Sequence, residues 1–149
     1  DVVDYVYYSG ALRGNFTSAE ASHLEDVKSV MYGANLAFVM ALIALLFIGV
    51  YLYKTGGLGN GLFYGGVAGG LLTLLLGIFG LLSYNALFEA FHKIFFPQGN
   101  WMFASDSLII TLFPGEFFVM AAAKILIFAM FFSGMFIITG YVLKARNRK

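Results

Sequence analysis

The side chains best suited to acid–base chemistry are the two histidines, His23 and His92. Each has a carboxylate three positions away, Asp26 after His23 and Glu89 before His92. Residues three apart lie on one face of a helix, where a carboxylate can fix the tautomer of an imidazole and raise its basicity. The spacing therefore predicts two histidine–carboxylate pairs for proton transfer. The alternative is that each histidine is an interfacial polar residue with a local ion pair.

Metal binding is a second chemistry open to the same side chains. Zinc accepts imidazole and carboxylate ligands, and both histidines with Asp26, Glu89 or Asp106 would supply them. However, the sequence contains no HExxH or comparable ligand spacing and no cysteine. A bound metal is therefore the less favoured interpretation, and we expect none.

Long uncharged stretches of the chain indicate the helices that must position these residues. The chain has 149 residues, of which 60% are hydrophobic and only 11% are charged. A membrane-spanning helix needs about 20 consecutive apolar residues. Three uncharged stretches are long enough, at 33–53, 55–88 and 125–143. They predict an all-α, polytopic transmembrane bundle, a single membrane domain over 1–149, with spans near 34–53, 61–84 and 120–143. A net charge of +1 argues against a nucleic-acid partner.

The distribution of Lys and Arg predicts the orientation of these spans. The C-terminal sequence KARNRK, residues 144–149, carries four basic residues and no acid, which places it in the cytoplasm by the positive-inside rule. The segments 85–119 and 1–33 then lie outside, together with all eight acidic residues. Because the chain begins outside at Asp1, we expect either a further helix ahead of it, which would make four, or a removed signal peptide.

Local signals refine the two outer segments. Thr17 and Glu20 have the spacing of a capping box, which predicts a helix beginning there. The helical pattern after the second span continues to Phe96, too far for one straight span. We expect residues 83–96 to bend onto the membrane surface as an interfacial helix. Its lipid side is predicted to hold Phe88, Phe91 and Phe95, with Glu89 and Lys93 turned to water or protein.

Two further patterns concern the second span and the segment before the third. Glycines recur every four residues, at 61, 65 and 69 and at 66 and 70, which favours close packing between helices. Residues 107–113, SLIITLF, are too few to cross a membrane and predict a short interfacial turn. Ser105 and Asp106 are expected to cap it, and Pro114 with Gly115 to end it.

Three sequence blocks resemble the signature blocks of a known family. They are HLEDVK at 23–28, FHKIFFPQGNWMF at 91–103 and DSLIITLFPGEFF at 106–118. The chain is similar here to the lipoprotein intramolecular transacylase (Lit) family of small bacterial integral membrane proteins. The resemblance implies an enzyme that moves the sn-2 acyl chain of a diacylglyceryl-modified lipoprotein onto the α-amino group of its own N-terminal cysteine. The product is the lyso-form lipoprotein, and no cofactor is needed.

The resemblance also suggests roles for individual residues. We expect His92 to be the principal base and His23 its partner or the acid, oriented by Glu89 and Asp26. Hydrogen-bond donors for the tetrahedral oxyanion are expected from Asn100 and Trp101. The active site would lie on the outer face of a bacterial cell membrane, among membrane lipids and with a diacylated lipoprotein as substrate.

Substrate binding is assigned to an aromatic wall and one lysine. The wall is predicted to hold the acyl chains with Phe91, Phe95, Phe96 and Phe103. Lys124, at the start of the last span, either extends to the lipid headgroups or contributes to binding. Two other functions stay open: a metal-dependent membrane hydrolase or acyltransferase using the same histidines, and a non-enzymatic membrane assembly protein.

Overall fold

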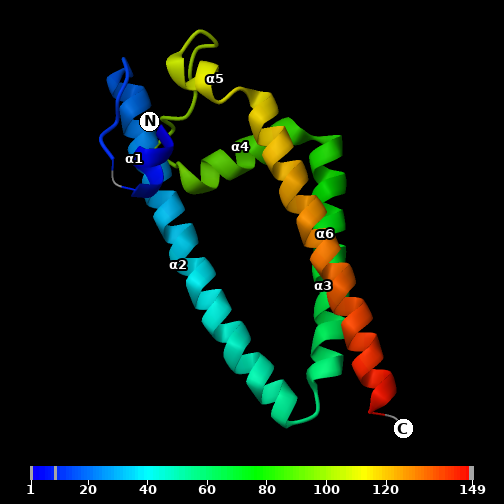
Figure 1. Ribbon diagram of the computed structural model, residues 1–149. Coiled ribbons are helices and arrows are strands. Elements are labelled where there is room, and N and C mark those ends of the chain that lie inside the picture. Colours follow the sequence, from blue (N-terminus) through cyan, green and yellow to red (C-terminus); the bar gives the residue numbers. More distant parts are fainter. Residues whose placement is uncertain (1, 9, 148–149) are drawn as a thin grey trace. The chain divides into compact units, whose positions relative to one another are not determined.

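The structure is a computed structural model that describes residues 2–8 and 10–147. Within these ranges every regular element is a helix, as predicted (Figure 1). The helices are α1 (Val2–Tyr8), α2 (Ser18–Lys54), α3 (Leu58–Leu82), α4 (Tyr84–Phe95), α5 (Leu108–Leu112) and α6 (Gly115–Arg146). The last two residues of the basic tail, 148 and 149, lie outside the described residues.

The prediction of three helices able to cross a membrane is confirmed. Helices α2, α3 and α6 each contain an 18-residue window with mean hydropathy of 2.6, 2.0 and 2.2 respectively. Helices α2 and α6 extend well beyond the predicted spans, because helix-forming residues continue past the apolar stretches. Gly33 does not interrupt α2, which is helical throughout its 37 residues.

The second span ends where the sequence was expected to bend. Helix α3 stops at Leu82, and Ser83 adopts a non-helical conformation with φ −156° and ψ 69°. The backbone N–H of Ser83 still donates to the carbonyl of Phe79, and α4 begins at the next residue. The helix predicted over 83–96 is therefore a separate element, α4, of 12 residues. Its position on the membrane surface stays a prediction.

The capping box at the start of α2 is also confirmed. The Thr17 backbone N–H and hydroxyl both donate to Glu20 Oε2 at 2.8 Å, and the Glu20 backbone N–H donates to the Thr17 hydroxyl at 3.3 Å. These bonds satisfy N–H groups that lack partners in the first turn of a helix. They fix the start of α2, and with it the helical register of the first histidine.

The chain divides into two compact units. The first, here called the histidine unit, consists of Asp1–Ala41 and Asn85–Phe118. The second, the span unit, consists of Leu42–Tyr84 and Val119–Lys149. Each unit has its own packing, and both histidines belong to the first.

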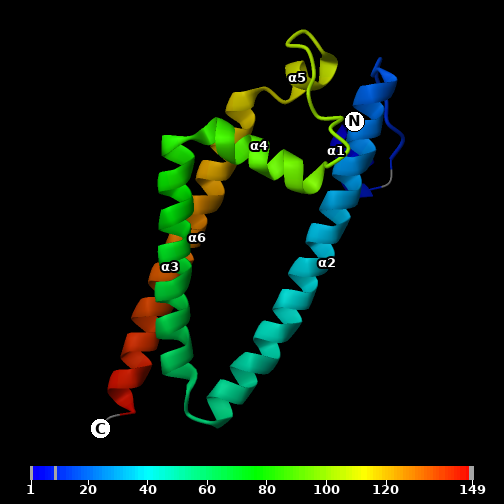
Figure 2. The same ribbon diagram turned by 180° about the vertical axis from the view of Figure 1, so that it is seen from behind.

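In the span unit, α3 and α6 run side by side in both views (Figure 1, Figure 2). Glycines permit this approach: a Cβ atom at Gly66 would lie 2.8 Å from the Ser133 carbonyl oxygen, and one at Gly140 would meet the Phe63 backbone. Of the predicted glycine repeats, Gly66, Gly69 and Gly70 face Ser133 and Gly61 faces Leu52, whereas Gly65 has no neighbour within 4 Å. Close packing is thus confirmed for only part of the pattern.

In the histidine unit, the buried residues come from α2, α4, α5 and the turn after α4. Helix α1 lies against α2, where Lys28 Nζ sits 4.6 Å from the centre of the Tyr5 ring. The most buried residues of this unit are Glu20, His23, Leu24, His92, Phe96 and Ile109. A core this small that contains a carboxylate and two imidazoles is unusual, because charged and polar groups are rarely buried without partners.

Candidate active site

The two histidines meet in the interior of the histidine unit. His23, from α2, is 6% exposed and His92, from α4, is 8% exposed. Their ring centroids are 6.4 Å apart and their planes are inclined by 23°. The Nε2 atoms of both rings are free of hydrogen bonds within the described residues. The arrangement therefore presents two neighbouring ring nitrogens that can exchange protons with a third group.

The tautomer of His92 is set by the backbone of its own helix. Nδ1 of His92 lies 2.8 Å from the carbonyl oxygen of Phe88, one turn earlier in α4. A carbonyl oxygen can only accept, so a neutral His92 ring carries its proton on Nδ1. The lone pair is then on Nε2, where it can act as a base. The Phe88 ring lies beside the imidazole, with centroids 4.0 Å apart.

The pKa of His23 depends on its burial and on the charges and side chains around it. Its Nδ1 atom is buried and has no hydrogen-bond partner among the described residues. Burial lowers the pKa of His23 below 6.5, and the nearby His92 lowers it further by charge repulsion. The charge of Asp26 and the side chain of Asn100 act in the opposite direction. The net effect is a lowered pKa, which favours the neutral form of the ring.

A tight turn after α4 brings the next residues back to the histidines. Pro97 cannot continue the helix, and the Gly99 backbone N–H donates to the Phe96 carbonyl at 3.0 Å. Gly99 has φ +78°, a left-handed conformation that glycine adopts without steric cost. This turn directs Asn100 and Trp101 toward α2 and α4.

Asp26 anchors that turn rather than bonding directly to a histidine. Its Oδ2 atom accepts hydrogen bonds from Gln98 Nε2 at 2.7 Å and from Asn100 Nδ2 at 2.6 Å. Asn100 Nδ2 also donates to the Ser22 hydroxyl at 3.3 Å. The Nδ2 group of Asn100 therefore already donates its hydrogen bonds to other residues of the protein. The expectation that Asn100 stabilises an oxyanion is not supported, because both of its N–H bonds already have acceptors.

The expected aromatic wall divides into two parts. Phe96, only 3% exposed, and Phe103 pack on His23, with centroids 4.7 and 5.4 Å from its ring. Phe91 and Phe95 stack on each other at 4.7 Å and are 45% and 47% exposed. The first pair encloses an imidazole, whereas the second presents an apolar surface beside the site.

Trp101 lies directly on the second histidine. Its ring centroid is 4.8 Å from that of His92. Across the described ranges, the indole N–H makes no hydrogen bond within the protein. Its role as an oxyanion donor stays a prediction.

Glu20 joins α2 to α5 behind the histidines. Its carboxylate, 2% exposed, accepts a hydrogen bond from the Ile109 backbone N–H at 3.0 Å as well as those from Thr17. These bonds lower the pKa of Glu20 below 4.5.

Ser105 and Asp106 were expected to cap the short apolar turn. Instead α5 starts after Ser107, without a side-chain cap of its own.

Two expectations about α4 are corrected. Glu89 does not orient His92: it forms an exposed ion pair with Lys93, at 2.7 Å, because opposite charges four residues apart attract on a helix surface. Phe88, expected to face lipid, packs instead against His92 and Phe118, whose ring centroid is 5.9 Å away.

The remaining predicted residues are not part of this cluster. Lys124 is exposed and belongs to the span unit, so its part in substrate binding stays a prediction. Asp106 is exposed in the loop before α5. Among residues 2–8 and 10–147, no group of three or more His, Asp or Glu side chains could hold a metal ion. The ligand set considered for zinc is not assembled there.

Three hydrogen-bonding groups in the structure around the histidines were not predicted. They are the Phe88 carbonyl, Gln98 and Ser22. The first is a backbone atom and leaves no trace in the sequence. The other two act through contacts between segments separated by 72 and 78 residues. A polar cluster directly after a Pro-containing helix end, PQGN, was the available signal for Gln98.

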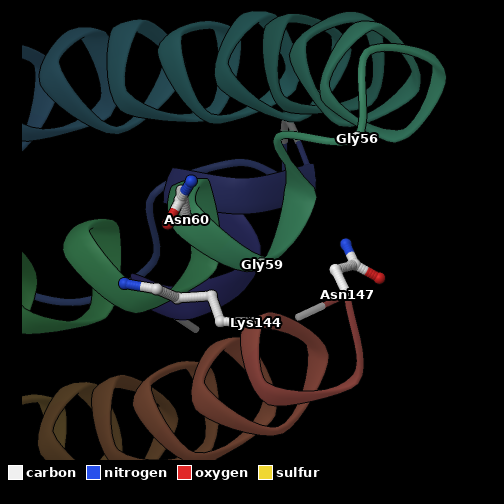
Figure 3. Close-up of a pocket in the computed structure, with 5 residues that line it drawn as sticks. All are labelled: Gly56, Gly59, Asn60, Lys144 and Asn147. Carbon is white, nitrogen blue, oxygen red and sulfur yellow. The ribbon is translucent and has the colours of Figure 1, made fainter. Parts of the chain in front are cut away.

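The span unit has a separate hollow at the start of α3. It is lined by Gly56, Gly59, Asn60, Lys144 and Asn147 (Figure 3). The Lys144 ammonium lies over the rings of Phe63 and Tyr64, 4.5 and 4.6 Å from their centres. None of the residues predicted for catalysis lies in this hollow.

The comparisons with known proteins agree with the blocks identified in the sequence. The family model described as lipoprotein intramolecular transacylase Lit matches residues 9–118, well over half of the chain. This range contains both histidines, Asp26 and the turn after α4. No curated protein and no solved structure gives a significant match. The chain belongs to the lipoprotein intramolecular transacylase (Lit) family.

Proposed function

We propose that the protein transfers the sn-2 acyl chain of a diacylglyceryl-modified lipoprotein to the α-amino group of its own N-terminal cysteine. The observation that carries this proposal is the pair of buried imidazoles 6.4 Å apart. Acyl transfer from an ester to an amine requires removing a proton from the amine and giving one to the leaving oxygen. Two neighbouring imidazoles with free Nε2 atoms suit both tasks.

His92 is the proposed base. An α-amino group has a pKa of about 7.7–8.0, so at neutral pH it is mostly protonated and cannot attack. The Phe88 carbonyl holds the Nδ1 proton of His92, which leaves Nε2 to accept a proton from the amine. The deprotonated nitrogen then attacks the carbonyl carbon of the ester.

His23 is the proposed acid partner. Because the charge of His92 lowers the pKa of His23, we propose that the pair holds at most one proton beyond those of the two neutral rings. That proton is passed to the glyceryl oxygen as its bond to the acyl carbon breaks and the new amide bond remains. An ammonium and an ester thus become an amide and an alcohol, with one further proton released to solvent.

Trp101 is the proposed donor to the tetrahedral oxyanion. Its indole lies against His92, and its N–H has no partner within the described protein. A donor next to the base is well placed, because the attacked carbonyl must lie within reach of both. Phe91 and Phe95 would contact the acyl chain, since their stacked rings form the exposed aromatic surface beside His92.

The site is proposed to lie at the outer leaflet of a bacterial cell membrane. Support comes from the positions of charge: the acidic residues all fall in segments assigned to the outer side, and the basic tail falls on the inner side. A diacylated lipoprotein anchored in that leaflet would bring donor ester and acceptor amine to the site in one molecule, which favours the reaction entropically.

The test is to incubate the purified protein in detergent or vesicles with a synthetic diacylated lipopeptide. Because the transfer is an isomerisation, the proposal predicts an unchanged intact mass, a blocked α-amino group and one free glyceryl hydroxyl, all read by tandem mass spectrometry. A product lighter by one acyl chain, formed only without chelator, would support a metal-dependent hydrolase instead. No change at all would support a non-enzymatic role.

A further inference from the structure

Two buried polar atoms beside the histidine pair lack partners, and they belong to neighbouring residues. They are Nδ1 of His23 and Oδ1 of Asn100. Buried polar atoms without hydrogen bonds are rare in folded proteins, so each such atom calls for a specific explanation. Both missing partners are explained if Nδ1 of His23 donates a hydrogen bond to Oδ1 of Asn100 during the reaction.

The orientation of the Asn100 amide follows from its other contacts. Its Nδ2 group lies 2.6 Å from the Asp26 carboxylate and 3.3 Å from the Ser22 hydroxyl. A carboxylate only accepts hydrogen bonds, so the amide nitrogen must face Asp26. Oδ1 is therefore the end of the amide that is left for His23, and it cannot flip away without breaking both bonds.

We propose that Asn100 is a positioning residue whose Oδ1 accepts the Nδ1 proton of His23, which makes Nε2 the nitrogen through which that ring exchanges its proton. This inference rests on the proposed function for its role in catalysis. The bond forms in the neutral ring that carries its proton on Nδ1, and it strengthens when Nε2 takes up a second proton, because Oδ1 is the buried acceptor beside Nδ1.

The electrostatic balance around His23 agrees with this assignment. The Asn100 side chain raises the pKa of His23, against the lowering by burial and by His92. Asp26 adds its negative charge and at the same time holds the amide in place. Both rings are then held with the proton on Nδ1, His92 by a backbone carbonyl and His23 by a side-chain carbonyl.

Gln98 provides a matched control. It donates to the same Asp26 oxygen as Asn100, at 2.7 Å, but no contact joins it to His23. Asn100→Leu removes both the bond from Asn100 to Asp26 and the Oδ1 acceptor, whereas Gln98→Leu removes only the bond from Gln98 to Asp26. Asn100→Asp keeps an oxygen at the position of Oδ1 and loses the donor that faces Asp26. Its added negative charge should raise the pKa of His23, in the opposite direction to Asn100→Leu.

The experiment is ¹⁵N NMR of the full-length protein with labelled histidine, since only two histidines contribute signals. We expect His23 with its proton on Nδ1 in the natural protein and in Gln98→Leu. In Asn100→Leu we expect mixed tautomers and a lower His23 pKa, with His92 unchanged, and in Asn100→Asp a higher His23 pKa. The inference is overturned if Asn100→Leu and Gln98→Leu give the same spectra, or if both Asn100 variants shift the pKa in one direction.

Activity on the diacylated lipopeptide gives a second readout. Loss of one hydrogen bond to a charged ring corresponds to a fall in kcat of about 10- to 100-fold for Asn100→Leu, with KM little changed. Gln98→Leu should stay within about threefold of the natural protein, because exposed polar contacts contribute little. A raised KM with unchanged kcat would overturn the inference in favour of substrate binding by Asn100. Absence of acyl transfer in the natural protein would overturn the proposed function, while the NMR comparison would still decide the tautomer.

Discussion

The imidazole rings of His23 and His92 lie nearly parallel, with their centroids 6.4 Å apart and their planes inclined by 23°. They come from different helices, yet both are buried in the same small core. Two ionisable rings this close cannot both be charged without strong repulsion. The pair therefore behaves as one unit in any proton transfer.

The coupling between the rings predicts opposite shifts for two substitutions. His92→Asn removes the positive charge that lowers the pKa of His23, so that pKa should rise. Asp26→Asn removes a negative charge that raises it, so the pKa should fall further below 6.5. Both shifts can be followed by NMR titration of the His23 ring protons. Equal pKa values in the three proteins would show that the rings do not interact.

Trp101→Phe tests the proposed oxyanion donor. The substitution keeps an aromatic ring against His92 and removes only the indole N–H. Loss of one oxyanion donor lowers kcat by about 10²–10³-fold in other enzymes, and a fall of this order is expected here with KM little changed. Steady-state kinetics on the lipopeptide measures both constants. If Trp101→Phe retained full activity, Trp101 would only pack against the histidine.

The buried carboxylate of Glu20 should stabilise the folded protein in a way that is lost at acidic pH. Its hydrogen bonds lower the pKa of the folded state below 4.5, so the stabilisation is present above that pH and is lost as the pH falls through the folded pKa. Glu20→Gln should lower the melting temperature at pH 7 and reduce its dependence on pH below 4.5. Glu25→Gln, an exposed change on the same helix, is the control. Circular dichroism melts would contradict the prediction if the two variants behaved alike.

The packing of α3 on α6 predicts a position-specific effect of adding one methyl group. A Cβ atom at Gly140 would overlap the backbone of Phe63, whereas one at Gly65 would meet nothing within 4 Å. Gly140→Ala should therefore destabilise the span unit by about 1–3 kcal/mol, the usual range for overpacking. Gly65→Ala should be neutral or slightly stabilising, because alanine favours helices. Denaturant titration in detergent compares them, and equal stabilities would refute the close approach.

The sequence predicted the helices because their signals are local. Uncharged stretches mark α2, α3 and α6, and the spacing of Thr17 and Glu20 marks the start of α2. A bend after the second span followed from length alone, since the pattern was too long for one span; α3 in fact stops at Leu82. Such patterns depend on residues within a few turns of each other, so one sequence suffices to read them.

The site was only partly predictable because its bonds connect distant segments. Spacing along a helix treated Asp26 and Glu89 alike. The structure separates them: Asp26 binds Asn100, 74 residues away, while Glu89 pairs with Lys93 one turn along. The partner of His92 is a backbone carbonyl, which every residue possesses. The periodicity of a sequence identifies neither contacts between distant segments nor hydrogen bonds to a backbone carbonyl.

The most direct test is acyl transfer by His92→Gln and His23→Gln, with Lys93→Gln, an exposed change on the same helix as His92, as the control. Tandem mass spectrometry of the lipopeptide would measure the fraction carrying the acyl chain on nitrogen, and circular dichroism would verify that each variant is folded. The account predicts a fall of about 10²–10⁴-fold for each histidine variant and almost no change for Lys93→Gln. Full activity in a folded His92→Gln protein would contradict it.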